Sequence, residues 1–471
     1  MTWNIQNPLL DVDSYKDSHA ALGAKHEWGQ YPPNTTKQWS YIEARKGAKF
    51  NETVFFGLQI WLKNLKPFTK SDIDEFVEFN KQHATPAGLE SNLRKILNDH
   101  GGNWPIEVRA VAEGTPVTAG NALAVITNTS TIGWWVPSWI ETQAQRAVWY
   151  PSTVATVSRE AKKIIKAALE ISADNTAGLP FKLHDFGARG ATCREQSGLG
   201  GAAHLVNFMG TDTKMGIAYA DAYYGGGMTG FSIPAMEHSS VTAWTETGEV
   251  SAFRNMLYQF GNESKILACV SDSFDLFRAI EDYWGTYLHK EVKDWGGTLV
   301  IRPDSGDPVA TPVEACARLM DKVGFTVNSK GYKMLPDYFR IIQGDGMNLK
   351  SIEMLCNHAM EEGISVDNFA FGMGGGLLQK VDRDTQRFAQ KLSQIIVDGQ
   401  AREVVKRPKT DPSKASKGGN LCLVRNHDGS YDTIQKWELL SPDSDLLVPV
   451  WRNGELLVDH RFEDVRARAS V

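Results

Sequence analysis

The chain has 471 residues, of which 42% are hydrophobic and 23% are charged, the balance of a soluble globular protein. This length exceeds what one ordinary core accommodates and predicts two domains or one elaborated barrel. The formal net charge of -6 lacks the basic field of a general nucleic-acid binder, so we expect no nucleic-acid partner.

The cysteine content and the apolar stretches indicate the compartment. The five cysteines are scattered and form no CxxC pair, which argues against a zinc site or a disulfide framework. The first residues carry no basic segment followed by a long apolar run, and the apolar stretch Trp134–Ile140 is short and interrupted by Pro137. We therefore expect a cytoplasmic protein without a signal peptide or a membrane span.

The two ends of the chain differ from its middle. Residues 1–150 mix short strands with helices such as Ser71–Gln82, and residues 381–471 contain a basic stretch followed by short strands near Asn420–Val424 and Leu446–Val450. Neither end shows a series of alternating strands and helices. We expect the two ends to pack together as one α+β domain.

The middle of the chain, residues 151–380, repeats one pattern. An apolar run of strand length ends in a charged, polar or glycine residue, and a helix-length segment follows. The pattern predicts an α/β fold with a TIM-like barrel, closed or distorted, and leaves a doubly wound open sheet as the alternative. In both folds the active site lies at the carboxyl ends of the strands. The runs are Phe181–Gly187, Leu205–Asp212, Phe231–His238, Ile266–Asp272, Thr298–Asp304, Phe339–Asp345 and Asn368–Gly374.

Two helices of this region have clear signals. Apolar residues recur at helical spacing between Val157 and Leu169. The segment Thr311–Glu314 reads TPVE, which predicts a helix capped by Thr311 with proline at its first position.

Polar residues at two of the predicted strand ends suggest chemistry. His238 follows Glu237, and a histidine side chain suits proton relay or phosphoryl acceptance, although its spacing also fits a structural histidine. Arg302 suits a phosphate, and Asp304 suits a ribose hydroxyl or a metal-bound water. The alternative is a mutual ion pair of these two residues.

Further segments suit a phosphorylated, flat ligand. The glycines of Gly344–Gly346 and Gly372–Gly376 follow successive strands and let backbone N–H groups converge on a phosphate. Phe186 and Arg189 sit together at another strand end, where a flat ring can stack, although a core phenylalanine with a surface arginine fits as well. Residues 401–417 hold six basic and two acidic residues and form either a wall for a polyanion or a solvated loop.

Taken together, these segments resemble a known family. The motifs DSYKDSH (Asp13–His19), YPPNT, HDFGARG, AAHLVNFMGTDT, SIPAMEHS, VSDSFD, IRPDSGDP, IIQGDG and FGMGGGLLQK occur in an order that closely resembles nicotinamide phosphoribosyltransferases. The resemblance extends from Asp13 beyond Lys417. It implies transfer of the phosphoribosyl group of phosphoribosyl pyrophosphate to nicotinamide by a homodimer with shared active sites.

The resemblance also implies roles for individual residues. Phe186 would stack on one face of nicotinamide and Tyr15 of the partner subunit on the other, while Asp212 would accept a hydrogen bond from the carboxamide. His238 would be phosphorylated by ATP, and Asp304 with Asp275 would belong to a Mg²⁺ site. Catalytic roles would fall to His238, Asp304, Arg302 and Glu237. Further substrate contacts would come from Arg189, Ser232, Ser271, Gly344, Asp345, Gly375, Arg383, Arg45, Lys391, Lys406 and Lys414.

Three alternatives remain at this stage. A nicotinate phosphoribosyltransferase would bind a carboxylate substrate, which Asp212 would repel. A Schiff-base aldolase on a barrel would need a lysine at a strand end, and none of the seven runs offers one. A non-catalytic binding or signalling homologue is disfavoured because the reacting residues are retained.

Overall fold

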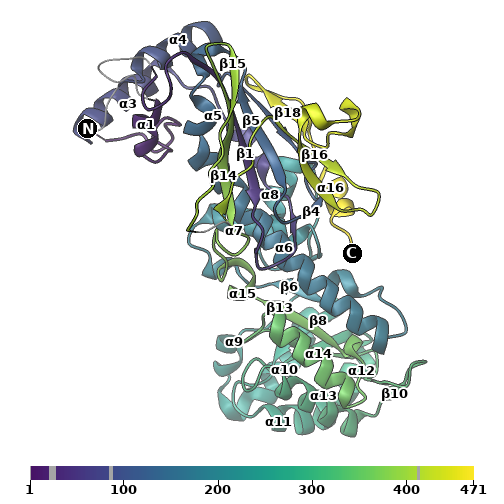
Figure 1. The fold of residues 1–471 in the computed structure, drawn as a ribbon. Coiled ribbons are helices and arrows are strands. Elements are labelled where there is room, and N and C mark those ends of the chain that lie inside the picture. The colour runs from purple at the N-terminus through teal and green to yellow at the C-terminus, as the bar shows by residue number, and fades with distance from the viewer. Residues whose placement is uncertain (1, 21–27, 84–87, 411–413) are drawn as a thin grey trace. The chain divides into compact units, whose positions relative to one another are not determined.

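A computed structural model describes residues 2–20, 28–83, 88–410 and 414–471 (Figure 1). Its contacts divide the chain into two compact units. The first unit comprises Met1–Thr156, Tyr223–Gly225 and Asp382–Ala469, and the second comprises Val157–Ala222, Gly226–Val381 and Ser470–Val471. No helix within the described ranges is both long enough and apolar enough to span a bilayer.

The first unit is built on a seven-stranded sheet whose neighbouring described strands run antiparallel. The long strand β1 lies near its middle and pairs with β14 on one side and β5 on the other. The strands, in sheet order, are β15 (Gln400–Glu403), β14 (Phe388–Val397), β1 (Thr35–Ala44), β5 (Ala122–Asn128), β3 (Ile106–Ala110), β18 (Val448–Arg452) and β19 (Glu455–Leu456).

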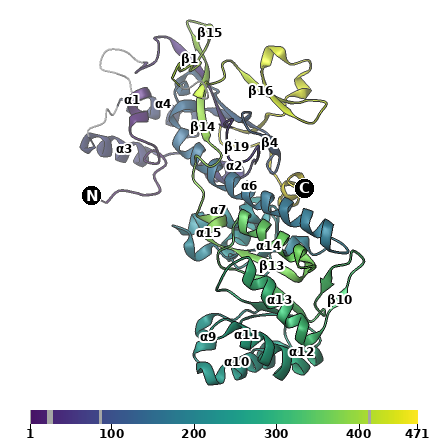
Figure 2. The ribbon, with the colours of Figure 1, turned by 60° about the horizontal axis from the view of Figure 1, so that its bottom comes forward.

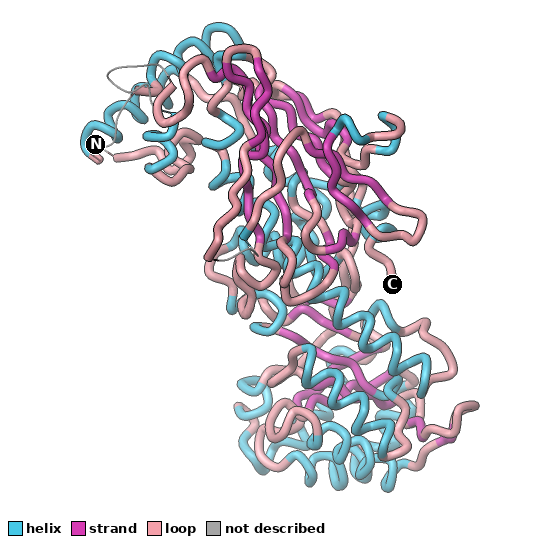
Figure 3. Tube along the Cα trace, in the orientation of Figure 1, coloured by secondary structure: helices cyan, strands magenta, loops and turns pink. Residues whose placement is uncertain are grey.

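Helices and two small two-stranded sheets complete the first unit (Figure 3). Buried aromatic side chains, among them Trp104, Trp135 and Trp139, fill its core. The helices are α1 (Tyr15–Ala20), α2 (Leu58–Asn64), α3 (Lys70–Gln82), α4 (Glu90–His100), α5 (Val136–Trp139) and α16 (Phe462–Arg468), and the small sheets pair β2 (Glu52–Val54) with β4 (Pro116–Thr118) and β16 (Leu421–Arg425) with β17 (Tyr431–Gln435). The helix α6 (Glu141–Ser172) contributes residues to both units.

The second unit is built on a curled sheet of six parallel strands, and helices gather around it (Figure 2). The strands, in sheet order, are β7 (Gly210–Thr211), β6 (Leu183–Asp185), β13 (Phe369–Met373), β12 (Phe339–Gln343), β9 (Thr298–Arg302) and β8 (Ile266–Val270). The surrounding elements are α7 (Arg194–Leu205), α8 (Lys214–Tyr224), α9 (His238–Thr242), α10 (Thr245–Phe260), α11 (Leu276–Arg278), the π-helix η4 (Ala279–Tyr287), α12 (His289–Trp295), α13 (Ala310–Val323), α14 (Leu349–Glu361) and α15 (Gly375–Leu378); a small hairpin pairs β10 (Thr326–Val327) with β11 (Lys333–Met334).

Six of the seven predicted runs contain strands of this sheet, and the seventh differs. The run Phe231–His238 forms isolated parallel bridges, from Phe231 to Gly210 and from Ala235 to Ala268. Pro234 interrupts it, and a proline has no N–H group for a continuous ladder. The observed sheet is therefore a curled parallel half-barrel, with this segment bridging β7 and β8.

The predicted cap of α13 is wrong. The helix begins at Ala310, so Thr311 lies inside it. Asp307 instead accepts hydrogen bonds from the N–H groups of Val309 and Ala310, at 2.9 and 2.8 Å. An aspartate satisfies the free amides of a first turn as well as a threonine does, so Asp307 takes the place predicted for Thr311.

Candidate active site

A cavity of about 510 Å³ lies in the second unit, among residues of the curled sheet. Most of its walls are apolar, and its polar lining residues include Asp212 and Arg302 at the carboxyl ends of β7 and β9. A largely apolar cavity with a few convergent polar groups is typical of a site for a flat organic ligand. Four predicted site residues line it, namely Phe186, Asp212, Ser232 and Arg302.

The Phe186 ring is seated on backbone that lacks side chains. A Cβ atom added at Gly372 would lie 2.0 Å from Cε2 of Phe186, and one at Gly344 would lie 3.4 Å from the same atom. The Phe186 N–H group also donates to the carbonyl of Met373 at 3.0 Å. The predicted glycines therefore set the position of the aromatic ring.

Asp212 stands at the end of β7 within a small polar group. The Ser232 hydroxyl donates to Oδ1 of Asp212 at 2.5 Å, and the Asp212 N–H group donates to the carbonyl of Asp185 at 3.0 Å. Burial raises the pKa of Asp185 to about 6, opposed by the hydrogen bond from Gly187 N–H and increased by the nearby Asp212 charge. The structure thus brings the predicted residues Asp212 and Ser232 into direct contact.

His238 opens α9 and is paired with a residue that the sequence prediction missed. Its Nε2 atom lies 2.9 Å from Oδ1 of Asp272, whose side chain is only 4% exposed, whereas the His238 side chain is 46% exposed. Glu237 precedes α9, and its carboxylate accepts from Ser239 rather than from His238. Asp272 lies in the motif VSDSFD, which is the signal that points to it.

Arg302 and Asp304 lie next to this pair, at the end of β9. Their closest N···O distance is 3.2 Å, so the predicted ion pair forms, while the buried Nε of Arg302 has no hydrogen-bond partner among the described residues. Burial raises the pKa of Asp304; Arg302 and His238 oppose this shift, and the carboxylates of Asp272 and Asp345 add to it. These interactions bring His238, Arg302, Asp304 and Asp345 into one electrostatic group.

The remaining predictions in the second unit have other surroundings. Asp275 caps α11, accepting from Arg278 N–H at 3.0 Å. The Ser271 hydroxyl is buried and bonded within the protein. Arg189 is exposed, and Gly375 is the first residue of α15 after β13.

A metal ion would be held by side chains of the described residues. Among them, no group of three or more His, Cys, Asp or Glu residues is arranged to hold a metal ion. Asp272, Asp304 and Asp345 nevertheless interact electrostatically, and carboxylate oxygens are the ligands that Mg²⁺ prefers. The chemistry of these carboxylates therefore suits a divalent cation.

Several predicted cations gather in the first unit. Burial lowers the pKa of Lys391; the nearby Glu141 opposes this, and the charges of Arg45, Lys406 and Lys16 lower it further. Lys16 pairs with Glu141, and its Nζ lies 5.3 Å from the centroid of the exposed Tyr15 ring. This group of positive charges suits a polyanionic substrate.

Two further basic residues of this unit are exposed. Arg383 lies 3.8 Å from Asp384, and Lys414 belongs to the basic stretch 401–417. Residues 411–413 of that stretch lie outside the described residues.

Known proteins match this chain over most of its length. The family model described as "Nicotinate phosphoribosyltransferase (NAPRTase) family" matches residues 181–438, and the model of the nicotinamide phosphoribosyltransferase N-terminal domain matches residues 7–108. A nicotinamide phosphoribosyltransferase of Xanthomonas campestris pv. campestris is 47% identical over 99% of both chains. That of Mycoplasma pneumoniae is 32% identical over 88% of this chain and 95% of its own.

Solved structures share the fold at lower identity. A nicotinate-nucleotide pyrophosphorylase from Pyrococcus furiosus has a TM-score of 0.62 at 16% identity, covering 99% of this chain and 96% of its own. Human nicotinic acid phosphoribosyltransferase has a TM-score of 0.59 at 16% identity, covering 97% and 92%. The fold and these matches define a phosphoribosyltransferase. The chain belongs to the nicotinate phosphoribosyltransferase family and, within it, to the nicotinamide phosphoribosyltransferases.

Proposed function

We propose that the protein transfers the 5-phosphoribosyl group of phosphoribosyl pyrophosphate to nicotinamide, giving nicotinamide mononucleotide and pyrophosphate in cytoplasmic NAD salvage. The observation that carries this proposal is a carboxylate, Asp212, at the edge of an apolar cavity that also contains the Phe186 ring. The ring and the carboxylate match the flat pyridine and the amide N–H group of nicotinamide. Nicotinate would place a second carboxylate beside Asp212, and the two negative charges would repel each other.

The phosphates would be bound by the cationic groups of the site. In the second unit Arg302, Arg189 and His238 would contact the pyrophosphate, Asp304 and Asp345 the ribose, and the backbone at Gly344 and Gly375 the 5′-phosphate. Arg383 would join them from its own unit. In a homodimer, Tyr15 and the basic residues Arg45, Lys391, Lys406 and Lys414 would complete the site of the partner subunit.

The reaction itself needs positioning and charge stabilisation. The nicotinamide ring nitrogen forms a bond to C1 of the ribose as the bond from C1 to the pyrophosphate oxygen breaks, through an oxocarbenium-like state. Arg302 and Arg189 would stabilise the negative charge that develops on the departing pyrophosphate. A Mg²⁺ ion, when bound near Asp304, would supply further neutralisation of the pyrophosphate. Asp275 would hold this ion together with Asp304.

We further propose that ATP phosphorylates His238 and thereby drives the transfer forward. The hydrogen bond between Nε2 and Asp272 supports this proposal, because it leaves Nδ1 free to attack the γ-phosphoryl group while ADP departs. Asp272 would then stabilise the positive charge that develops on the ring. Glu237 is the exposed residue before the reacting histidine, and its carboxylate would assist catalysis from the solvent-facing side.

The finer architecture is also a proposal. We infer that residues 231–235, through their bridges to Gly210 and Ala268, complete the parallel sheet as a distorted TIM-like barrel. The barrel domain would then span residues 151–380, and residues 1–150 and 381–471 would form the α+β domain.

One assay tests the function. The protein is incubated with phosphoribosyl pyrophosphate and either nicotinamide or nicotinic acid, with and without ATP, and the product mass is measured. Formation of nicotinamide mononucleotide, stimulated by ATP, is the expected result, and His238→Ala should retain slow ATP-independent transfer while losing the stimulation. A preference for nicotinic acid would indicate the related activity, and binding without turnover would indicate a non-catalytic homologue.

A further inference from the structure

Trp284 is linked through Ser271 to the loop that carries Asp272, the partner of the proposed phosphoryl acceptor His238. It does not line the cavity, and it is not among the groups assigned to substrate. It belongs to the π-helix η4 and is fully buried. A π-helix is rare and frequently accompanies a functional site, because its wider turn redirects the side chains that it carries. The direction of the Trp284 indole N–H group therefore matters.

The indole N–H group is directed at the loop that carries Asp272. Nε1 of Trp284 donates to the hydroxyl of Ser271 at 3.0 Å, and this hydroxyl donates in turn to the carbonyl of Cys269 at 3.1 Å. The Ser271 N–H group donates to the carbonyl of Arg302 at 3.0 Å. Ser271 is thus bonded to three elements, and its backbone fixes the starting direction of Asp272, the next residue.

The Trp284 ring also packs against a neighbouring helix, α10. Trp284 stacks on Phe253 with ring centroids 4.5 Å apart and an interplanar angle of 23°. Phe253 is fully buried in α10, the helix that follows α9 and its first residue, His238. Trp284 therefore contacts the residue before Asp272 and the helix that follows the one carrying His238.

We infer that Trp284 is a positioning residue that holds Asp272 against His238 and so sets the rate of ATP-dependent phosphorylation. This inference rests on the proposed phosphohistidine. The His238–Asp272 hydrogen bond joins an exposed ring to a nearly buried carboxylate, and α9 has only five residues to hold the ring in place. The packed Trp284 side chain would hold the loop of Asp272 in place, and Asp272 would then restrict the orientations open to the exposed His238 ring.

The test replaces the donor and keeps the ring. Trp284→Phe retains an aromatic side chain against Phe253 and removes the hydrogen bond to Ser271. The rate of formation of acid-labile phosphate on His238 from γ-labelled ATP should fall about tenfold, the scale of one buried hydrogen bond, with half-saturation by ATP unchanged. ATP-independent transfer should remain within about twofold of wild type.

Trp295→Phe is the matched control. The indole N–H group of Trp295 donates to the carbonyl of Gly261 at 2.6 Å in the same unit, so this variant loses the same kind of bond away from His238. Its phosphorylation rate should equal that of the wild type. Ser271→Ala removes the acceptor instead of the donor and should reproduce the slow phosphorylation, and combining it with Trp284→Phe should add little.

The outcomes separate the inference from the function on which it rests. An unchanged phosphorylation rate in both Trp284→Phe and Ser271→Ala overturns the inference. A parallel fall of phosphorylation and ATP-independent transfer also overturns it, because Trp284 would then serve only the general structure. A wild-type protein that takes up no phosphate on His238 contradicts the ATP part of the proposed function, and the inference is lost with it.

Discussion

The charge of a single residue, Asp212, is expected to set the choice between nicotinamide and nicotinic acid. Its carboxylate accepts from Ser232 and lines the cavity beside Phe186. Asp212→Asn removes the repulsion of a nicotinate carboxylate and weakens a charge-assisted hydrogen bond to the amide. The ratio of kcat/KM for nicotinamide to kcat/KM for nicotinic acid should therefore fall about tenfold.

Asp221→Asn is the control for the Asp212 variant. Asp221 is exposed in α8 and accepts from Gly227 N–H at 2.9 Å, so the variant makes the same change of charge in the same unit without touching the cavity. Its substrate ratio should equal that of the wild type. An unmutated enzyme with equal kcat/KM for both substrates would contradict the role of Asp212.

The position of the Phe186 ring depends on Gly372. A methyl group there would lie 2.0 Å from the ring, so the ring must move. Gly372→Ala should raise KM for nicotinamide about tenfold, from the loss of roughly 1.4 kcal/mol of aromatic stacking. Steady-state kinetics measure this, with Gly178→Ala as the control, because its Cβ would meet its nearest neighbour at 3.4 Å. Equal KM values for the two variants would show that the ring position is unimportant.

At the scale of elements, apolar runs predicted the sheet because buried parallel strands are apolar along their length. Six runs contain strands, but the same pattern did not reveal that Pro234 would leave its run with isolated bridges. Local rules predicted the wrong cap for α13, because Asp307 and Thr311 are both capping residues and only the loop geometry selects Asp307.

The sequence predicted part of the site and missed the contacts between distant segments. The motifs identified the strand ends at Asp212 and Arg302, since parallel strands place their carboxyl ends at one edge, whereas His238 follows a segment that forms only isolated bridges. They did not identify Asp272 as the partner of His238, because a sequence does not tell which carboxylate of VSDSFD turns inward. The contact between Phe186 and Gly372 joins segments far apart in the chain, and spacing alone contains no signal for it.

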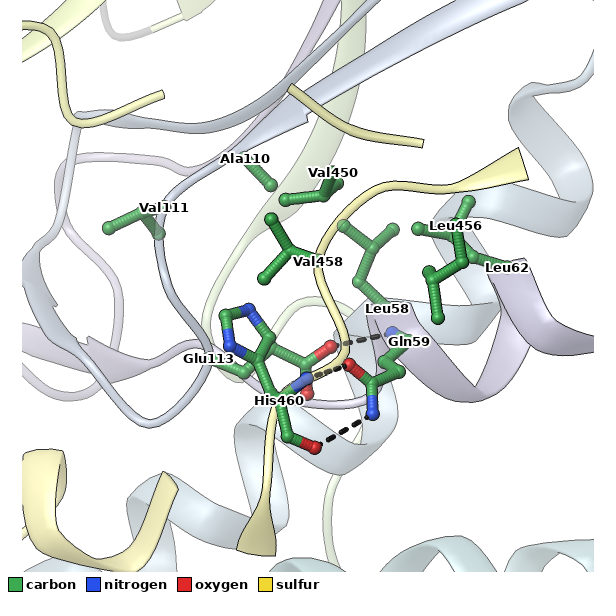
Figure 4. A pocket seen from close by; sticks show the side chains of 10 residues that line it. All are labelled: Leu58, Gln59, Leu62, Ala110, Val111, Glu113, Val450, Leu456, Val458 and His460. Atoms are coloured by element: carbon green, nitrogen blue, oxygen red, sulfur yellow. Dashed lines mark hydrogen bonds between the residues drawn. The ribbon is translucent and has the colours of Figure 1, made fainter. Parts of the chain in front are cut away.

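The start of α2 depends on one buried carboxyl group, Glu113. It accepts from the N–H groups of Gly57 and Gln59 at 2.9 and 2.6 Å and from the Tyr224 hydroxyl at 2.7 Å (Figure 4 shows its approach to Gln59). Glu113→Ala leaves these buried donors unpaired and should lower the free energy of unfolding by about 3 kcal/mol. Urea unfolding measures it, and Tyr224→Phe, which loses one bond of the three, should cost about 1 kcal/mol.

The Glu113 contribution should also depend on pH. Burial raises the pKa of Glu113 above its ordinary value of 4.5, although the three donors oppose this. The folded protein then holds this proton more tightly than the unfolded chain, so the stabilisation is full below pH 4.5 and declines as pH rises through the folded pKa. Glu113→Gln cannot titrate, so its stability relative to wild type should increase with pH, and a constant difference would contradict the assignment.

For the whole molecule, the proposed site residues are divided between the two units. The second unit holds Phe186, Asp212, His238 and Arg302, and the first holds Tyr15 and the group of lysines and arginines. Neither unit alone has both the reacting residues and the full set of cations for a polyanionic substrate. The proposed homodimer would supply the residues of the first unit from the partner subunit.

Complementation between two inactive variants tests this shared site. Tyr15→Ala removes a residue of the first unit, and Arg302→Ala removes one of the second. If each site takes Tyr15 from one subunit and Arg302 from the other, a mixed dimer has one intact site and one doubly mutated site. Random exchange makes half of the dimers mixed, so the mixture should recover about a quarter of wild-type activity. Mass spectrometry confirms the exchange, and a confirmed mixture that stays inactive would show that Tyr15 serves the site of its own chain.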